Sequence, residues 1–186
     1  MTTFIPSLTL PAAVFASPAA SILLPIALGT AVGFSVSRTH SSCPPFHIRT
    51  SILVHLTDTS YLAKESQKTY MALKQPPYRP PPQVFGPAWT VLYGLMGFAA
   101  YCAYSTGMAP TASLEKHLLT KQGATLYTIQ LGLNLVWMPL FFVAKRPIEA
   151  TVDIVALTGV TGYLTYIWGQ VDPVAGWALA PYLGWL

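Results

Sequence analysis

One charge-free stretch, residues 83–105, constrains the fold more than any other part of the chain. If helical, its 23 residues extend roughly 34 Å, which is enough to cross a bilayer core of about 30 Å. The three prolines at 80–82 lack backbone N–H groups, so they cannot continue a helix from upstream and mark where this one begins. Phe85, Trp89 and Tyr93 recur every four residues and therefore share one face of the helix.

Composition places the whole chain in the same class. Only 9% of its 186 residues are charged and 53% are hydrophobic, which predicts a protein of the lipid bilayer. The net charge of +4 comes from scattered loop residues, so we expect no nucleic-acid partner. Cys43 and Cys102 have no metal-ligand spacing, and we interpret both as free thiols.

The hydrophobic pattern predicts an all-α integral membrane bundle of five transmembrane helices. The expected spans are residues 19–37, 83–105, 123–144, 148–168 and 174–186. The last span is roughly 20 Å long, too short to cross a bilayer alone. The N-terminal segment, residues 1–18, has no charge, unlike a typical secretory or mitochondrial signal. The loops at 38–82 and 106–122 are polar.

Several residues have expected structural roles. Gly29 and Gly33 form a G-x-x-x-G pair, which predicts close packing against another helix. Asp153 lies about one turn inside the fourth span, so its carboxylate is expected to reach towards the membrane surface. Trp168 and Trp177 flank a short turn and are interpreted as anchors at the membrane interface.

Polar and aromatic residues inside the spans are the candidates for ligand binding. Gln130 and Asn134 lie four residues apart on one helix face, and Trp137 follows one turn later. Such amides either join helices by hydrogen bonds or supply the few polar groups of an apolar pocket, and the residues alone favour neither. Trp89, Trp137 and Trp185 could enter one cavity, or each could anchor the protein at the interface.

The sequence contains no recognisable catalytic or metal-binding motif. A nucleophile–base arrangement, a glycine-rich phosphate loop and paired catalytic carboxylates are all missing, and no histidine pair has metal-ligand spacing. The histidines also lie outside the expected spans, which disfavours haem ligation within the bundle. We therefore expect no required cofactor.

Three ordered stretches resemble the translocator protein and tryptophan-rich sensory protein (TspO/MBR) family, whose animal members are also called peripheral benzodiazepine receptors. They are Val84-Phe-Gly-Pro-Ala-Trp-Thr-Val-Leu-Tyr93, Gln130-Leu-Gly-Leu-Asn-Leu-Val-Trp-Met-Pro-Leu-Phe-Phe142 and Pro181-Tyr-Leu-Gly-Trp-Leu186. The resemblance covers about residues 20–38 and 69–186. The family loop after the first helix is much shorter, so residues 40–66 look like an insertion. The family's last helix continues further, so the fifth helix looks truncated here.

The resemblance implies a function and a site. It implies binding of a porphyrin or other tetrapyrrole, haem included, or of sterol-like lipids such as cholesterol, in a cavity between the helices. The protein would then act as a sensor, scavenger or transport accessory. A porphyrin-degrading enzyme that uses light and oxygen and a transmembrane transporter are the alternatives. In the family, residues matching Trp89 and Trp185 contact porphyrin, and those matching Asn134 and Trp137 line the cavity. With Gln130, Phe85 and Tyr93, these form the predicted ligand-binding set.

Orientation and location are further expectations. Loops one and three contain eight of the ten Lys and Arg residues, so the positive-inside rule places them in the cytosol. The resemblance to animal members implies the mitochondrial outer membrane rather than the endoplasmic reticulum. The sequence leaves the oligomeric state open, a homodimer included.

Overall fold

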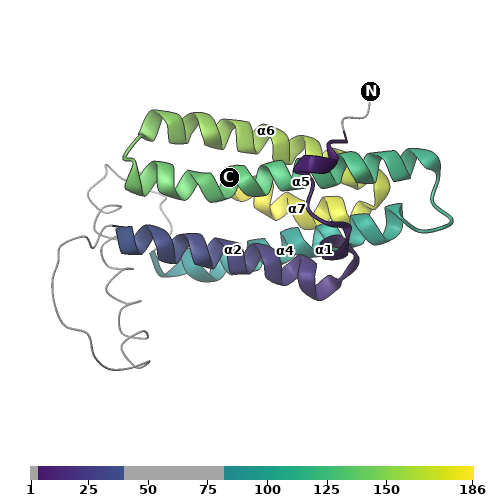
Figure 1. The fold of residues 1–186 in the computed structure, drawn as a ribbon, viewed down its shortest axis with the longest axis horizontal. Coiled ribbons are helices and arrows are strands. Elements are labelled where there is room, and N and C mark those ends of the chain that lie inside the picture. Colours follow the sequence, from purple (N-terminus) through teal and green to yellow (C-terminus); the bar gives the residue numbers. More distant parts are fainter. Residues whose placement is uncertain (1–3, 40–81) are drawn as a thin grey trace.

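The chain forms a helical bundle whose helices run back and forth along one direction (Figure 1). The computed structural model describes residues 4–39 and 82–186, and within these ranges it contains helices and no strand. The five main helices are α2 (Pro18–Thr39), α4 (Pro82–Gly107), α5 (Leu114–Met138), α6 (Pro147–Val171) and α7 (Pro173–Trp185). The predicted all-α class is confirmed for these ranges, and the expected insertion at 40–66 lies outside them.

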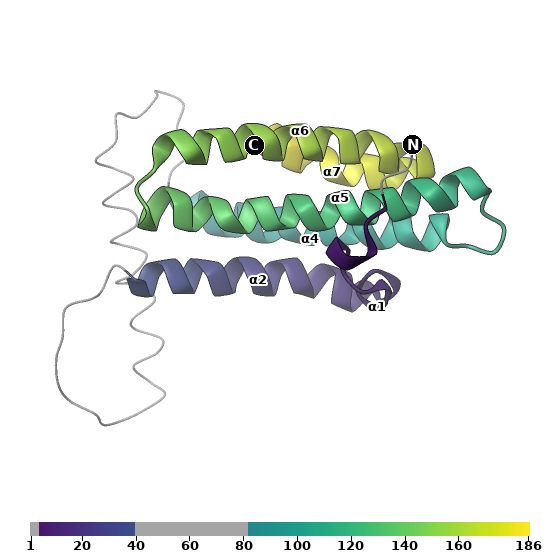
Figure 2. The same cartoon turned by 45° about the horizontal axis from the view of Figure 1, so that its top comes forward.

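The order of the helices in space differs from their order along the chain. Helix α2 packs on α4, and α5 packs on α6, while the C-terminal helix α7 lies between α4 and α6 (Figure 2). Helix α5 also contacts α2 and α4. Residues from α4, α5 and α7, far apart in sequence, therefore face a shared interior.

Helix α5 begins earlier than the sequence predicted. We expected a loop to residue 122, but the helix starts at Leu114, and the side chain of Ser113 accepts a hydrogen bond from the backbone N–H of Lys116 at 3.3 Å. This N-cap satisfies one donor that the helix would otherwise leave open. The expectation that the histidines lie outside the spans is wrong for His117, because the apolar helical segment Leu114–Val143 includes it.

The turn between α5 and α6 is tight. Helix α5 passes into a π-helical turn, η2 (Pro139–Val143), which a hydrogen bond from Ala144 N–H to the Pro139 carbonyl closes at 2.9 Å. Lys145 then adopts a φ of 52°, in the left-handed region that reverses the chain direction. Pro147 occupies the first turn of α6, where its missing N–H removes no helical bond.

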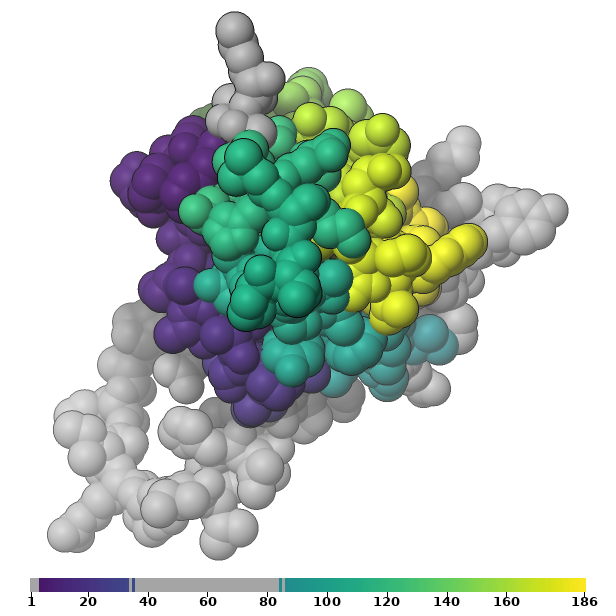
Figure 3. Space-filling view, turned by 90° about the vertical axis from the view of Figure 1, so that its right-hand side faces the viewer, coloured from purple at the N-terminus to yellow at the C-terminus, as the bar shows by residue number. Residues whose placement is uncertain are grey.

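The N-terminal segment folds onto the bundle. It contains η1 (Pro6–Leu8) and α1 (Ala12–Ala16), neither of which the sequence predicted. The hydroxyl of Thr9 lies 2.7 Å from that of Thr125 on α5, and Phe15 is buried. At one end of the molecule the N-terminal residues, the α4–α5 connection and the α6–α7 turn together form the surface (Figure 3).

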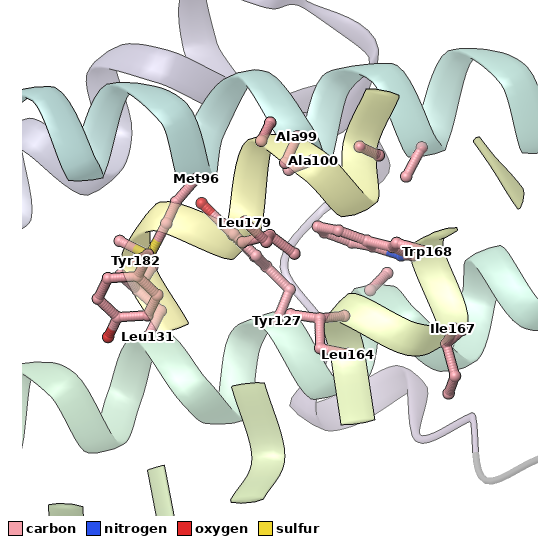
Figure 4. Packing of buried hydrophobic residues seen from close by; sticks show 14 of the residues in the cluster. Met96, Ala99, Ala100, Tyr127, Leu131, Leu164, Ile167, Trp168, Leu179 and Tyr182 are labelled. Carbon is pink, nitrogen blue, oxygen red and sulfur yellow. The ribbon is translucent and has the colours of Figure 1, made fainter. Parts of the chain in front are cut away.

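A buried aromatic cluster fills this half of the interior. Tyr127 on α5 stacks on Trp168 on α6 with ring centroids 5.4 Å apart (Figure 4). Phe15 meets Tyr127 edge to face at 5.8 Å. Trp168, predicted as an interfacial anchor, is 1% exposed, so that interpretation is wrong for it. Trp177 is 76% exposed, as an anchor would be. The two indoles differ in exposure because Trp168 lies on the interior face of α6.

Helices α2 and α4 pack closely at two glycines, one on each helix. A Cβ added at Gly29 would lie 2.7 Å from Cζ of Tyr93, and one added at Gly97 would lie 2.6 Å from Cα of Ile22. The backbones of α2 and α4 thus approach most closely at Gly97, where a side chain has no room. The predicted close packing is confirmed at Gly29, whereas a Cβ added at Gly33 would meet no described atom within 4 Å.

Two helical segments in the described ranges are long and apolar enough to cross a bilayer. They are Leu114–Val143 and Pro147–Val171, judged by length and composition alone, with a shorter apolar helix at Pro18–Gly33. Helix α4 has the length but is rich in aromatic and small residues. The five-span architecture therefore goes beyond what these helices establish and belongs to the proposal below.

Candidate functional site

A buried amide joins three helices at the centre of the candidate site. The hydroxyl of Tyr93 on α4 donates to Oδ1 of Asn134 on α5 at 2.6 Å. Nδ2 of Asn134 donates to the hydroxyl of Tyr182 on α7 at 2.9 Å. Asn134 is 4% exposed, and in an apolar interior such paired polar groups fix the positions of their helices. The hydroxyl of Tyr182 acts here as an acceptor and retains its own proton for donation.

An indole ring covers this hydrogen-bonded group. The Trp89 ring lies 5.5 Å from the ring of Tyr93 and 6.3 Å, edge to face, from that of Tyr182. Both distances suit attractive contacts between aromatic rings. Trp89 is only partly buried, so part of its surface remains available beyond these contacts. The arrangement offers a flat apolar surface beside a few oriented polar atoms.

A second amide lies one turn before Asn134 on the same face of α5. Gln130 is fully buried, and its Nε2 donates to the sulfur of Met96 on α4 at 3.4 Å. Its Oε1 has no hydrogen-bond partner among the described residues. An unpaired acceptor in an apolar interior costs free energy, so Gln130 retains the capacity to accept a hydrogen bond from a bound molecule or water.

The other predicted residues are more dispersed. Trp137 stacks on Phe141 with centroids 5.1 Å apart and meets Phe142 edge to face at 6.1 Å, so it belongs to an aromatic group at the α5–η2 junction. Trp185 is partly buried and packs against the core cluster. Phe85 lies on α4, and its side chain is outside the described part.

The positions of two residues differ from what the sequence predicted. Tyr182 is fully buried and completes the site, although we assigned a role only to its neighbour Trp185. The available signal was its spacing, because residues three apart on a helix share a face. Asp153, expected to reach the surface, is 9% exposed and lies on the interior face of α6, so that expectation is wrong.

Helix α2 contacts the site through one glycine. Its Gly29 leaves space for the ring of Tyr93, so the missing side chain positions the tyrosine that bonds to Asn134. The site therefore combines aromatic faces with oriented polar atoms. Among the residues that the structure describes, no group of three or more His, Cys, Asp or Glu is placed to hold a metal ion.

Comparison with known proteins gives a consistent picture. The sequence profile of the TspO/MBR family matches residues 21–186. The chain is 42% identical over 120 residues to the translocator protein homolog of Schizosaccharomyces pombe, which covers 64% of this chain and 70% of the relative. It is 36% identical over 122 residues to the human translocator protein, covering 66% and 69% of the two chains. It is 36% identical over 126 residues to the tryptophan-rich protein TspO of Archaeoglobus fulgidus, covering 68% and 76%.

Proposed function

Because this chain belongs to the TspO/MBR family of membrane proteins, we propose that it binds a flat apolar ligand between α4, α5 and α7. The ligand class is a porphyrin or another tetrapyrrole, or a sterol-like lipid, and the protein acts as a sensor, scavenger or transport accessory. The observation that carries this proposal is the Asn134 amide, which bonds to Tyr93 and Tyr182 beneath the indole of Trp89. Binding sites for such ligands combine apolar walls with a small number of oriented polar groups.

The proposal includes five membrane spans. Helices α5 and α6 have the required length and apolarity, and α4 lacks charge along residues 83–105. Helices α2 and α7 pack on α4, and their exposed surfaces are rich in aliphatic side chains such as Leu23, Leu28 and Val174. Lipid is a suitable solvent for those surfaces.

The mitochondrial outer membrane is the proposed location, and a fluorescent fusion protein imaged with organelle markers tests it.

Replacing Trp89 tests the ligand site. We expect Trp89→Phe to weaken protoporphyrin binding severalfold, because phenyl offers less stacking surface than indole. Binding is measured by the absorbance of the porphyrin in titrations of the purified full chain, so the loss of one fluorophore does not affect the reading. The matched control is Trp177→Phe, since Trp177 is 76% exposed on the outside of α7. Equal affinity of the Trp89 variant and the control variant would remove Trp89 from the site.

The same preparation distinguishes the alternative activities. A binding protein leaves the porphyrin spectrum unchanged after illumination in air, whereas a degrading enzyme bleaches it and forms a new product. A transporter gives saturable flux of the ligand in proteoliposomes. Absence of protoporphyrin and cholesterol binding to the unmodified chain would contradict the proposed function as a whole.

A further inference from the structure

The carboxylate of Asp153 is buried on the interior face of α6. Asp153 is 9% exposed, and its neighbours on the same helical stripe, Ala150 and Leu157, are each 1% exposed. An ionisable side chain on the interior face of a membrane helix is costly, and such residues usually mark a ligand or ion pathway. Asp153 therefore needs a compensating interaction.

Within the described ranges, one oxygen of this carboxylate lacks such an interaction. Oδ2 of Asp153 has no hydrogen-bond partner. The only ion pair in these ranges joins Arg146 and Glu149 at 3.4 Å on the exposed start of α6. Lys116 donates to the carbonyl of Val171 at the other end of the helix. A buried carboxylate oxygen without a partner destabilises the protein unless the group is neutralised by a proton or by a cation.

Asp153 lies next to the candidate site rather than in a separate part of the bundle. Gly123 on α5 faces Trp168 on α6, and the two helices are antiparallel, so Asp153 lies level with Trp137 and Met138. The same register places Asn134 level with Leu157, so Asp153 lies about one helical turn along α6 from the level of the Asn134 hydrogen bonds.

We propose that Asp153 binds the positively charged end of the ligand, so that the site prefers a flat apolar molecule carrying a protonated amine. This inference rests on the proposed function and specifies its ligand class. An ammonium group would pair with the unpartnered oxygen, and nearby aromatic faces attract cations as well. The apolar body of the ligand would lie against Trp89 and Tyr182. An internal water would satisfy the oxygen too, but it would give no preference for a cationic ligand.

The test compares two sterols that differ at one atom position. The probes are cholesterol and 3β-aminocholest-5-ene, whose amine is protonated at pH 7, and both are titrated against the purified full chain in detergent. We expect the aminosterol to bind about tenfold more tightly, as one charge-assisted hydrogen bond in an apolar site would allow. This comparison uses the unmodified protein, so it does not depend on the folding of any variant. Equal binding of the two probes would overturn this inference and leave the proposed function standing.

Variants then locate the preference. Asp153→Asn has nearly the same shape without the charge, and we expect it to lose the preference for the aminosterol while it still binds cholesterol and protoporphyrin. Glu149→Gln is the matched control, because Glu149 is an exposed acid on the same helix and should leave the preference unchanged. A preference that persists in Asp153→Asn would exclude Asp153 as its source. Binding of neither sterol nor of protoporphyrin to the unmodified chain would overturn the proposed function and this inference together.

Discussion

Gly123 shows how one missing side chain positions an aromatic residue in this bundle. A Cβ added there would lie 2.5 Å from Cδ1 of Trp168, closer than real carbon atoms approach. The indole therefore occupies space that any other residue would fill, and it stacks on Tyr127 from the same helix as the glycine. The contact is part of the packed interface between α5 and α6, since both rings are about 1% exposed.

Substitution of this glycine should be costly. We expect Gly123→Ala to lower the stability of the folded bundle by about 1–3 kcal/mol, because the indole must move and close packing is lost. Unfolding of the purified protein in increasing SDS, followed by near-ultraviolet circular dichroism, measures the change. Gly132→Ala is the control on the same helix, where a Cβ would meet no described atom within 4 Å and alanine favours the helix. Equal stability of the two variants would contradict the proposed role of the contact.

Individual residue roles could be predicted only where the sequence itself limits the options. The spacing of Gln130 and Asn134 already placed both amides on one face, and both are buried in the structure. Trp168 and Trp177 could not be separated, because both are indoles near the same turn. Their exposure depends on which face of α6 meets α5 and which face of α7 meets α4, and this is set by contacts distant in the sequence.

The N-terminal segment is an element of the bundle rather than a free extension. Phe15 of α1 stacks on Tyr104 of α4 at 5.7 Å and meets Tyr127 of α5 edge to face. The backbone N–H of Leu10 donates to the hydroxyl of Thr128 at 3.1 Å, so polar contacts also tie this segment to α5. The segment thereby contacts both α4 and α5.

Truncating this phenylalanine tests the role of the segment. We expect Phe15→Ala to destabilise the protein by about 3 kcal/mol, because it removes a fully buried ring from a packed cluster. Phe4→Ala is the control, since Phe4 is 40% exposed in the same segment. Limited proteolysis at the N-terminus should also speed up in the Phe15 variant alone. Resistance equal to that of the control would mean that the segment does not depend on Phe15 for docking.

Helix ends were harder to predict than helix existence. Their long apolar runs located α4 and α6 to within about three residues, because such a run admits few other structures in a membrane protein. The start of α5 was missed because its first two turns contain charged residues, which we interpreted as loop. The Ser113 cap extends the helix past the apolar stretch, so hydropathy alone underestimates its length.

At the scale of the whole molecule, the positions of the basic residues and the directions of the helices predict one orientation in the membrane. The α5–α6 turn contains Lys145 and Arg146, and it lies at the opposite end of the bundle from the α4–α5 connection (Figure 1). The positive-inside rule then places the α5–α6 turn in the cytosol. The placement of α7 between α4 and α6 could not be read from the sequence, because periodicity shows which face is buried and not which helix covers it.

Cysteine labelling tests this orientation. In a background with both native cysteines replaced by serine, Thr111→Cys lies in the α4–α5 connection and Ala144→Cys lies just after η2. In intact organelles we expect a membrane-impermeant maleimide to label Ala144→Cys and not Thr111→Cys, because α5 separates the two positions across the bilayer. Detergent should make both reactive, which shows that each thiol is accessible in principle. Labelling of both positions in intact organelles would mean that α5 does not span the membrane. Labelling of Thr111→Cys alone would reverse the orientation and place the eight basic residues of loops one and three on the far side.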